Sequence, residues 1–260
     1  MSIRFASLGS GSKGNGTLVT CGDTCLLVDC GFTIKETVKR LAQLGVTEPG
    51  SLAGILVTHE HGDHLSGVAP LARRFNLPVW MSYGTRRVAR DVKNLTQLQL
   101  FHAGECLHIG DAEVTPFTVP HDAAEPCQFT FQSPGSKRLV LLTDLGKNTP
   151  YVQRNLQDCD GILLECNYDI EMMKDGPYPP ALQTRITGDY GHLGNPQAAE
   201  ILAGMTYDRL QHIVLSHLSE QNNTPEKAQS AILEAVPERV HERVSVSSQQ
   251  KGTAVWHEIL

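Results

Sequence analysis

The chain has 260 residues, of which 40% are hydrophobic and 19% charged, so it can bury a substantial core and is not expected to be largely disordered. Its 22 basic and 28 acidic residues give a net charge of −6, which disfavours a broad basic surface for gripping nucleic acid. The sequence contains neither a membrane-length apolar run nor a secretion signal, and its seven cysteines are an odd number, so we expect no membrane contact and a cytoplasmic protein with free thiols.

Strands and helices alternate along the whole chain. Thr33 and Glu36 form a capping box that opens a helix, and Gly45 is a suitable stop for it. Further helices are predicted over residues 66–75 and from the Asn-Pro and Thr-Pro pairs at 195–196 and 224–225. Apolar or alternating runs predict strands at residues 3–8, 17–20, 24–31, 54–59, 78–81, 113–121, 127–132, 138–144, 161–165, 212–217, 243–247 and 253–259.

One long stretch, residues 167–191, has no clear period and is rich in Pro, Gly and Tyr. Irregular loops of this length in compact domains tend to be functional, so we expect a lid-like or mobile segment here. No repeat or linker divides the chain. The mixture of strands and helices therefore favours a sheet core covered by helices, in a single domain over residues 1–260.

The densest group of potential metal ligands is THEHGDH at residues 58–64, which contains His59, His61, Asp63 and His64. Positions two apart point to opposite sides of a helix, so His59 and His61 could share a metal only on an irregular loop. Imidazole combined with carboxylate favours zinc or a similar divalent ion. So many ligands in one short segment favour two adjacent metals rather than one.

Two metals need more ligands than this segment supplies. Three further polar residues stand directly after apolar strands, namely His121, Asp144 and His217. Each alone could be a polar strand cap. As a set, they would complete the site if their strands end at the same place.

The HEHGDH segment resembles the H-x-H-x-D-H signature of the metallo-β-lactamase superfamily, and the three later ligands follow in the order that superfamily uses. The resemblance covers essentially the whole chain. It implies an α+β fold, a four-layer αββα sandwich with metals at one edge of the two sheets. It also implies that Asp29, in LLVDCG, supports the site.

The resemblance further assigns seven residues to two divalent ions. Three histidines would hold one ion, two histidines and an aspartate would hold the other, and a second aspartate would bridge them. In that order the residues are His59, His61 and His121, then Asp63, His64 and His217, and the bridging Asp144. The bridging aspartate resembles the hydrolase and nuclease branches rather than most true β-lactamases. Zinc is the first choice of metal, and manganese or iron also suits these ligands.

Shorter motifs indicate which subgroup of the superfamily the chain resembles. SLGSGSKGN, PHDAAEP, GHLGN and LSHLSEQNN resemble the YycJ (WalJ) subgroup, whose relatives include PhnP-type cyclic phosphodiesterases. This resemblance implies phosphodiester cleavage, with DNA as substrate and 5′-to-3′ exonuclease action.

The implied mechanism is attack of a metal-activated hydroxide on phosphorus, with Asp63 and Asp144 orienting the hydroxide. His192, in GHLGN, is the candidate for protonating the leaving oxygen or holding the phosphate. A helix-capping role for His192 is an equal alternative.

Four other residues are candidate substrate contacts. The loop at residues 9–15 would offer backbone N–H groups together with Ser12, Lys13 and Asn15 to a phosphate, although a plain hairpin turn is the alternative. Asn222 would hydrogen-bond the substrate or support its own loop.

Three functions remain open at this point. The first is a metal-dependent phosphodiesterase acting on DNA, which would gather basic side chains around its cleft. The second is a small-molecule hydrolase for a cyclic phosphodiester or a thioester, and the third is a non-catalytic, metal-bound regulatory module. The basic candidates for the first are Lys13, Arg73, Arg74, Arg86, Arg87 and Arg185, which could equally be solvated surface charges.

Overall fold

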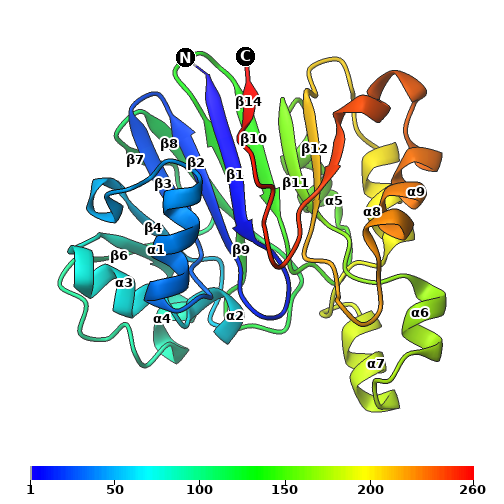
Figure 1. The fold of residues 1–260 in the computed structure, drawn as a ribbon, viewed down its shortest axis with the longest axis horizontal. Helices are drawn as coiled ribbons and strands as arrows, with labels where there is room; N and C mark the ends of the chain where they lie inside the picture. Colours follow the sequence, from blue (N-terminus) through cyan, green and yellow to red (C-terminus); the bar gives the residue numbers. More distant parts are fainter. Residues whose placement is uncertain (1) are drawn as a thin grey trace.

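Two seven-stranded sheets packed face to face form the centre of the structure, a computed structural model that describes residues 2–260 (Figure 1). From one edge to the other, the first sheet contains β14 (His257–Ile259), β1 (Ile3–Gly9), β2 (Gly16–Cys21), β3 (Thr24–Val28), β4 (Gly54–Leu56), β5 (Val79–Ser82) and β6 (Leu98–Phe101). The second contains β13 (Val244–Val246), β12 (His212–Ser216), β11 (Gly161–Glu165), β10 (Arg138–Leu142), β9 (Cys127–Gln132), β8 (Ala112–Thr118) and β7 (Leu107–Ile109).

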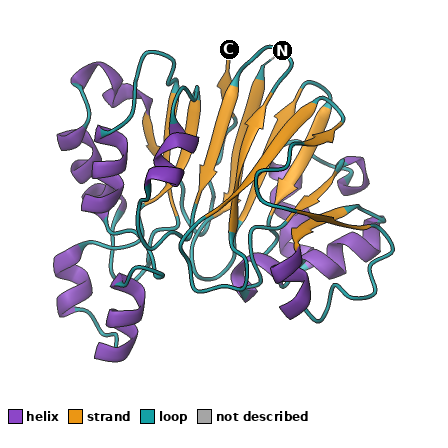
Figure 2. Ribbon diagram, turned by 180° about the vertical axis from the view of Figure 1, so that it is seen from behind, coloured by secondary structure: helices purple, strands orange, loops and turns teal. Residues whose placement is uncertain are grey.

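Helices cover both outer faces of this pair of sheets (Figure 2). Those on the first sheet are α1 (Ile34–Gln43), α3 (Val68–Phe75) and α4 (Tyr83–Val88). Those on the second are α5 (Pro150–Leu156), α8 (Asn195–Ala203) and α9 (Pro225–Ala235). Three short helices lie near the lower edge of the sheets in Figure 1, namely α2 (Gly62–Leu65), α6 (Ile170–Asp175) and α7 (Pro180–Thr187). Two 3₁₀ turns complete the assignment, Pro49–Ser51 and Glu238–Arg243.

Three apolar clusters fill the spaces between the four layers. The middle one joins the sheets, with Phe5 on one side and Phe129 on the other. The second packs Leu41 and Leu71 under the helices of the first sheet, and the third places Ile201 among the helices of the second. The predicted α+β, αββα sandwich is therefore confirmed.

Several predicted strands end earlier than their apolar runs. The runs at 24–31, 138–144 and 212–217 stop at residues 28, 142 and 216, because the residues that follow leave the extended conformation. Asp29, Asp144 and His217 have φ of 59°, 53° and 55°. A positive φ cannot continue a strand, so each of these residues turns the chain sharply away from its sheet.

Two other predictions are corrected by the structure. Residues 167–191 are not a long irregular loop, because they contain α6 and α7, each opened by a favourable residue at its start. The helix predicted over 66–75 begins at Val68, and the preceding Gly62–Leu65 forms a separate turn of helix. β6, β7, α4 and α5 were not predicted from the sequence, because their segments are short and weakly patterned.

The structure bears on two expectations from the sequence, which concern free thiols and membrane contact. All seven cysteine thiols are free. Across residues 2–260, none of the helices combines the length and apolar character needed to cross a lipid bilayer.

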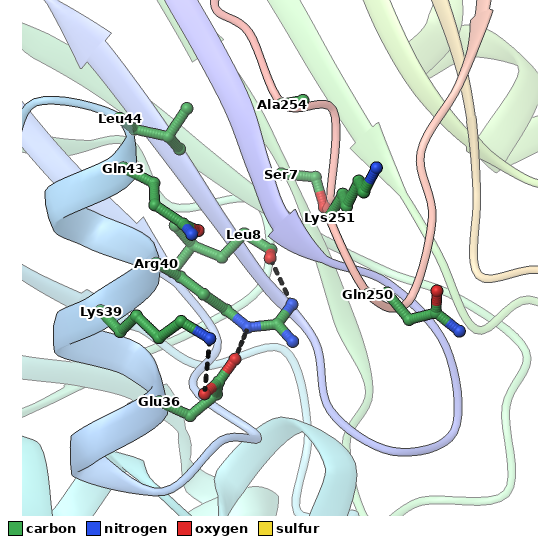
Figure 3. Close-up of a pocket in the computed structure, with 10 residues that line it drawn as sticks. All are labelled: Ser7, Leu8, Glu36, Lys39, Arg40, Gln43, Leu44, Gln250, Lys251 and Ala254. Atoms are coloured by element: carbon green, nitrogen blue, oxygen red, sulfur yellow. Dashed lines mark hydrogen bonds and ion pairs between the residues drawn. The ribbon is translucent and has the colours of Figure 1, made fainter.

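Arg40 fastens α1 to the first sheet and to the C-terminal segment beside a cavity of about 260 Å³ (Figure 3). Its Nε donates to Glu36 at 2.7 Å, and its Nη1 donates to the carbonyls of Leu8 at 2.6 Å and Gln249 at 3.0 Å. Its guanidinium also lies over the Phe32 ring at 4.4 Å. One mostly buried cation therefore joins three segments that are far apart in the sequence.

We expect Arg40→Met to lower the free energy of unfolding by about 2 kcal/mol, because it leaves two buried carbonyls without a charged donor. Lys39→Met is the matched control on the same helix. Its side chain is 64% exposed and its Nζ lies 3.8 Å from Glu36 Oε2, so the change should cost less than about 1 kcal/mol. Urea unfolding of both variants measures the difference, and equal costs would contradict the fastening role of Arg40.

Candidate metal centre

The candidate ligands meet where parallel strands of both sheets end. β3 runs parallel to β4, and β10, β11 and β12 run parallel to one another, so their carboxyl ends lie at a common edge. Each of these strands delivers a polar side chain to that edge. In strand order they are Asp29, His59, Asp144, Glu165 and His217.

The first group of candidate ligands consists of His59, His61 and His121, whose ring nitrogens lie within 4.8 Å of one another. His61 Nδ1 is 3.3 Å from His121 Nε2. His59 and His121 are buried, whereas His61 is partly exposed. The three imidazoles therefore surround one small space that opens on the side of His61.

The second group consists of Asp63, His64 and His217, again within 4.8 Å. Asp144 lies between the two groups. Its Oδ2 is 3.1 Å from His64 Nε2, and its Oδ1 is 3.4 Å from His217 Nε2 and 4.0 Å from His121 Nε2. The structure thus brings together all seven residues that the sequence analysis selected as ligands.

Contacts behind the rings fix their orientation. Asp29 Oδ2 lies 2.8 Å from His64 Nδ1, and its two oxygens accept hydrogen bonds from Thr58. Thr58 Oγ1 is 2.9 Å from His59 Nδ1, and the Gly191 carbonyl is 2.9 Å from His121 Nδ1. A partner on Nδ1 leaves Nε2 to face the centre, which is the usual arrangement around metal-binding histidines. Asp29 therefore lies directly behind His64 and Thr58.

Glu165 is a site residue that the sequence analysis missed. It is fully buried, and its Oε1 lies 2.7 Å from His192 Nδ1 and 3.4 Å from His217 Nδ1. Its Oε2 accepts the backbone N–H of Leu145 at 2.8 Å. The available signal was its position at the end of the apolar run GILLE, directly comparable to Asp144 and His217.

The loop at residues 9–15 contacts the second group directly. Asn15 Nδ2 is 3.2 Å from Asp63 Oδ2 and 3.0 Å from His64 Nε2, and Ser10 Oγ accepts the backbone N–H of His217 at 2.8 Å. Gln249 holds this loop in turn, because its side chain bonds the Lys13 N–H and the Gly14 carbonyl. Asn15 is buried, contacts Gly11 of its own loop as well as the candidate ligands, and is not among the residues that line the cavity.

The other candidate substrate contacts differ in position. Ser12 lines the cavity beside the ligands. Lys13 is exposed and pairs with Glu220 at 2.5 Å. Asn222 is fully buried away from the lining residues, with its side chain packed against Gly176. The structure therefore brings Ser12, but not Asn222, to the cavity.

Electrostatics divide the buried histidines into two kinds. Burial, reinforced by the neighbouring His64, lowers the pKa of His59 well below its usual value. Burial also opposes protonation of His64 and His217, but carboxylates led by Asp144 outweigh it and raise both pKa values, that of His217 to about 10. In the metal-free protein, protons on His64 and His217 balance the buried carboxylates.

The surroundings of His59 indicate that these residues fit a metal. Its Nε2 is buried and has no hydrogen-bond partner among residues 2–260. Leaving such a buried polar atom unpaired costs roughly 1–3 kcal/mol, which coordination to a cation would remove. The donor set of imidazole and carboxylate suits zinc and similar divalent ions.

A cavity of about 380 Å³ opens onto this centre. One side carries His61, Asp63, Asp144, His192 and His217. The other side comes from the segment around α7 and from the neighbouring Asp122. Its residues are Tyr178, Leu182, Arg185 and Ile186. Among the basic residues proposed from the sequence, Arg185 therefore lines the cavity and Lys13 flanks it, whereas the arginine pairs on α3 and α4 do not line it.

A family model described as the beta-lactamase superfamily domain matches residues 24–218. The chain belongs to the beta-lactamase superfamily. It is 36% identical over 244 residues to exodeoxyribonuclease YycJ of Bacillus anthracis, covering 92% of this chain and 91% of that protein. It is 35% identical over 231 residues to exodeoxyribonuclease WalJ of Streptococcus pneumoniae, covering 87% and 85%. The metallo-beta-lactamase fold protein YhfI of Bacillus subtilis superposes with a TM-score of 0.75 at 17% identity, over 99% of both chains.

The identity of 35–36% to YycJ and WalJ over most of the chain confirms the resemblance to that subgroup. The superfamily, the named relatives and the His and Asp groups at the sheet edge together identify the chain as a metal-dependent hydrolase that binds divalent metal.

We expect metal binding to release protons, because His64 and His217 must lose theirs before their nitrogens can coordinate. Since their pKa values are raised, metal affinity should increase with pH through the neutral range and fall as the pH falls. Calorimetric titration of zinc into metal-free protein, in buffers with different ionisation enthalpies, measures the released protons. His217→Asn should release fewer, and an apparent enthalpy that is the same in every buffer would contradict this prediction.

Proposed function

We propose that this protein is a metal-dependent phosphodiesterase that degrades DNA from the 5′ end. The observation that carries this proposal is the position of Asp144 between the two ligand groups, within 3.1–4.0 Å of His64, His217 and His121. A carboxylate in that position suits a pair of metals, and paired metals are typical of phosphodiester hydrolysis. Two relatives that match most of the chain are named exodeoxyribonucleases, which favours DNA as the substrate.

We further propose that the site holds two divalent ions, with zinc as first choice and manganese or iron as alternatives. His59, His61 and His121 would hold one, Asp63, His64 and His217 the other, and Asp144 both. When bound, such ions lower the pKa of water and neutralise charge that develops on a phosphate. Because ligands come from both sheets, we also propose that residues 1–260 act as one domain, and that it works in the cytoplasm, where thiols remain reduced.

The chain's own residues have separate tasks in this proposal. Asp63 and Asp144 orient the attacking oxygen, since both carboxylates line the cavity at the second ligand group. His192 lines the same cavity, and Glu165 holds its Nδ1 at 2.7 Å. That contact leaves His192 Nε2 to give a proton to the leaving oxygen. Ser12 is placed to contact the phosphate from the opposite loop.

A substrate panel tests the function. Metal-loaded protein is incubated with 5′- and 3′-labelled DNA and with bis-p-nitrophenyl phosphate, with and without a chelator. We expect chelator-sensitive cleavage of both, with DNA shortened from the 5′ end. Cleavage of the small diester alone would favour the small-molecule hydrolase, and no cleavage at full metal loading would favour a non-catalytic metal-bound module.

His192→Ala separates proton donation from metal binding. We expect its kcat for DNA to fall by about 100-fold or more, as for loss of a general acid, while the metal content stays at the wild-type level. Glu165→Gln should give a smaller loss, because the histidine remains but its ring is held by a neutral partner. Metal analysis by mass spectrometry accompanies the kinetics, and wild-type turnover in His192→Ala would exclude His192 as the donor.

A further inference from the structure

The segment that contains α6 and α7 projects beyond the lower edge of the two sheets (Figures 1 and 2). α7 has no buried residue, so it adds nothing to the three apolar cores. Leu182 and Ile186 instead lie one turn apart on α7 and line the cavity, together with Tyr178, which precedes the helix. All three are half-buried. They form an apolar wall opposite the candidate ligands, which we call the α7 wall.

The α7 wall is fastened to the ligand groups at two places. The Arg185 guanidinium binds Asp122 at 2.6 Å, and Asp122 Oδ1 is 3.5 Å from His121 Nε2. The Ile186 carbonyl accepts the backbone N–H of His192 at 2.8 Å. Gly191 permits this approach, because a Cβ there would lie 2.1 Å from the Ile186 carbonyl oxygen. The wall therefore stands at a fixed distance from the reacting centre.

The cavity between the α7 wall and the candidate ligands is small. Its volume of about 380 Å³ is near the lower end of the range for small-molecule sites, roughly 300–1,000 Å³. One face is rich in imidazole and carboxylate, which suits a phosphate carried on metals, and the other is apolar with a tyrosine, which suits a nucleobase. A single nucleotide combines these two chemistries at about this size.

We propose that the α7 wall closes the cavity on one side, so that the cavity accepts the terminal nucleotide of a DNA strand and excludes a strand that passes through. The wall then makes cleavage end-specific, and Arg185 is a positioning residue that holds the wall to Asp122. This inference rests on the proposed function and adds the reason why the enzyme acts at ends.

The test compares a linear DNA strand with the covalently closed circle of the same sequence, and uses bis-p-nitrophenyl phosphate, a diester with no strand to pass through the cavity, to check that the metal centre is intact. The double substitution Leu182→Ala/Ile186→Ala removes most of the apolar side chains of the wall. Arg185→Gln removes the ion pair with Asp122 that holds the wall in place. In both variants the ratio of circle to linear cleavage should rise by about tenfold or more, the size of effect expected for lost pocket contacts. Both variants should still cleave the small diester in a chelator-sensitive way, which shows that the metal centre remains intact.

Thr187→Ala is the matched control, because Thr187 belongs to the same helix but is exposed and outside the cavity lining. Its ratio should equal that of wild type. The inference is overturned if wild type cuts the circle as fast as the linear strand, or if folded, metal-loaded wall variants keep the wild-type ratio. In either case cleavage of the small diester and of the linear strand would still support the proposed function. If the metal-loaded protein cleaved none of the three substrates, both the proposed function and this inference would be rejected.

Discussion

Buried imidazoles and carboxylates can share one space only when their charges balance. At the sheet edge, Asp144 is fully buried among His64, His217 and His121, and Asp29 and Glu165 stand behind these rings. Without metal, protons on His64 and His217 supply the balance, whereas His59 stays neutral with an unpaired nitrogen. Cations would replace those protons and satisfy that nitrogen. The fold around the site serves to hold this costly arrangement together.

The backbone contributes to that cost. Asp29, Asp144 and His217 adopt left-handed conformations where their strands end, each at roughly 1–3 kcal/mol. Close backbone approaches complete the geometry, since a Cβ on Gly31 would lie 1.7 Å from the Asp63 carbonyl oxygen. Only glycine can therefore sit at position 31 beneath the HEHGDH turn. The three apolar cores supply the stability that allows this local strain.

The net charge of −6 is compatible with a phosphate substrate because positive charge is needed only locally. Arg185 lines the cavity and Lys13 flanks it, and both are paired with carboxylates, Asp122 and Glu220. Most of the attraction for a phosphate would then come from the bound cations rather than from basic side chains. This arrangement suits the handling of one nucleotide at a time better than a long electrostatic grip on DNA.

The sequence by itself selected the candidate ligands and determined the class of fold. HEHGDH concentrates ligands in one segment, and His121, Asp144 and His217 each follow an apolar run, which places them at strand ends whatever the packing. Only the tertiary structure decided how those ends meet. Glu165 also ends an apolar run, yet its role depends on parallel β11 lying between β10 and β12. The order of strands in a sheet cannot be predicted from the local sequence pattern. The α7 wall escaped prediction for the same reason, because its apolar side chains face a cavity made by distant residues rather than a core.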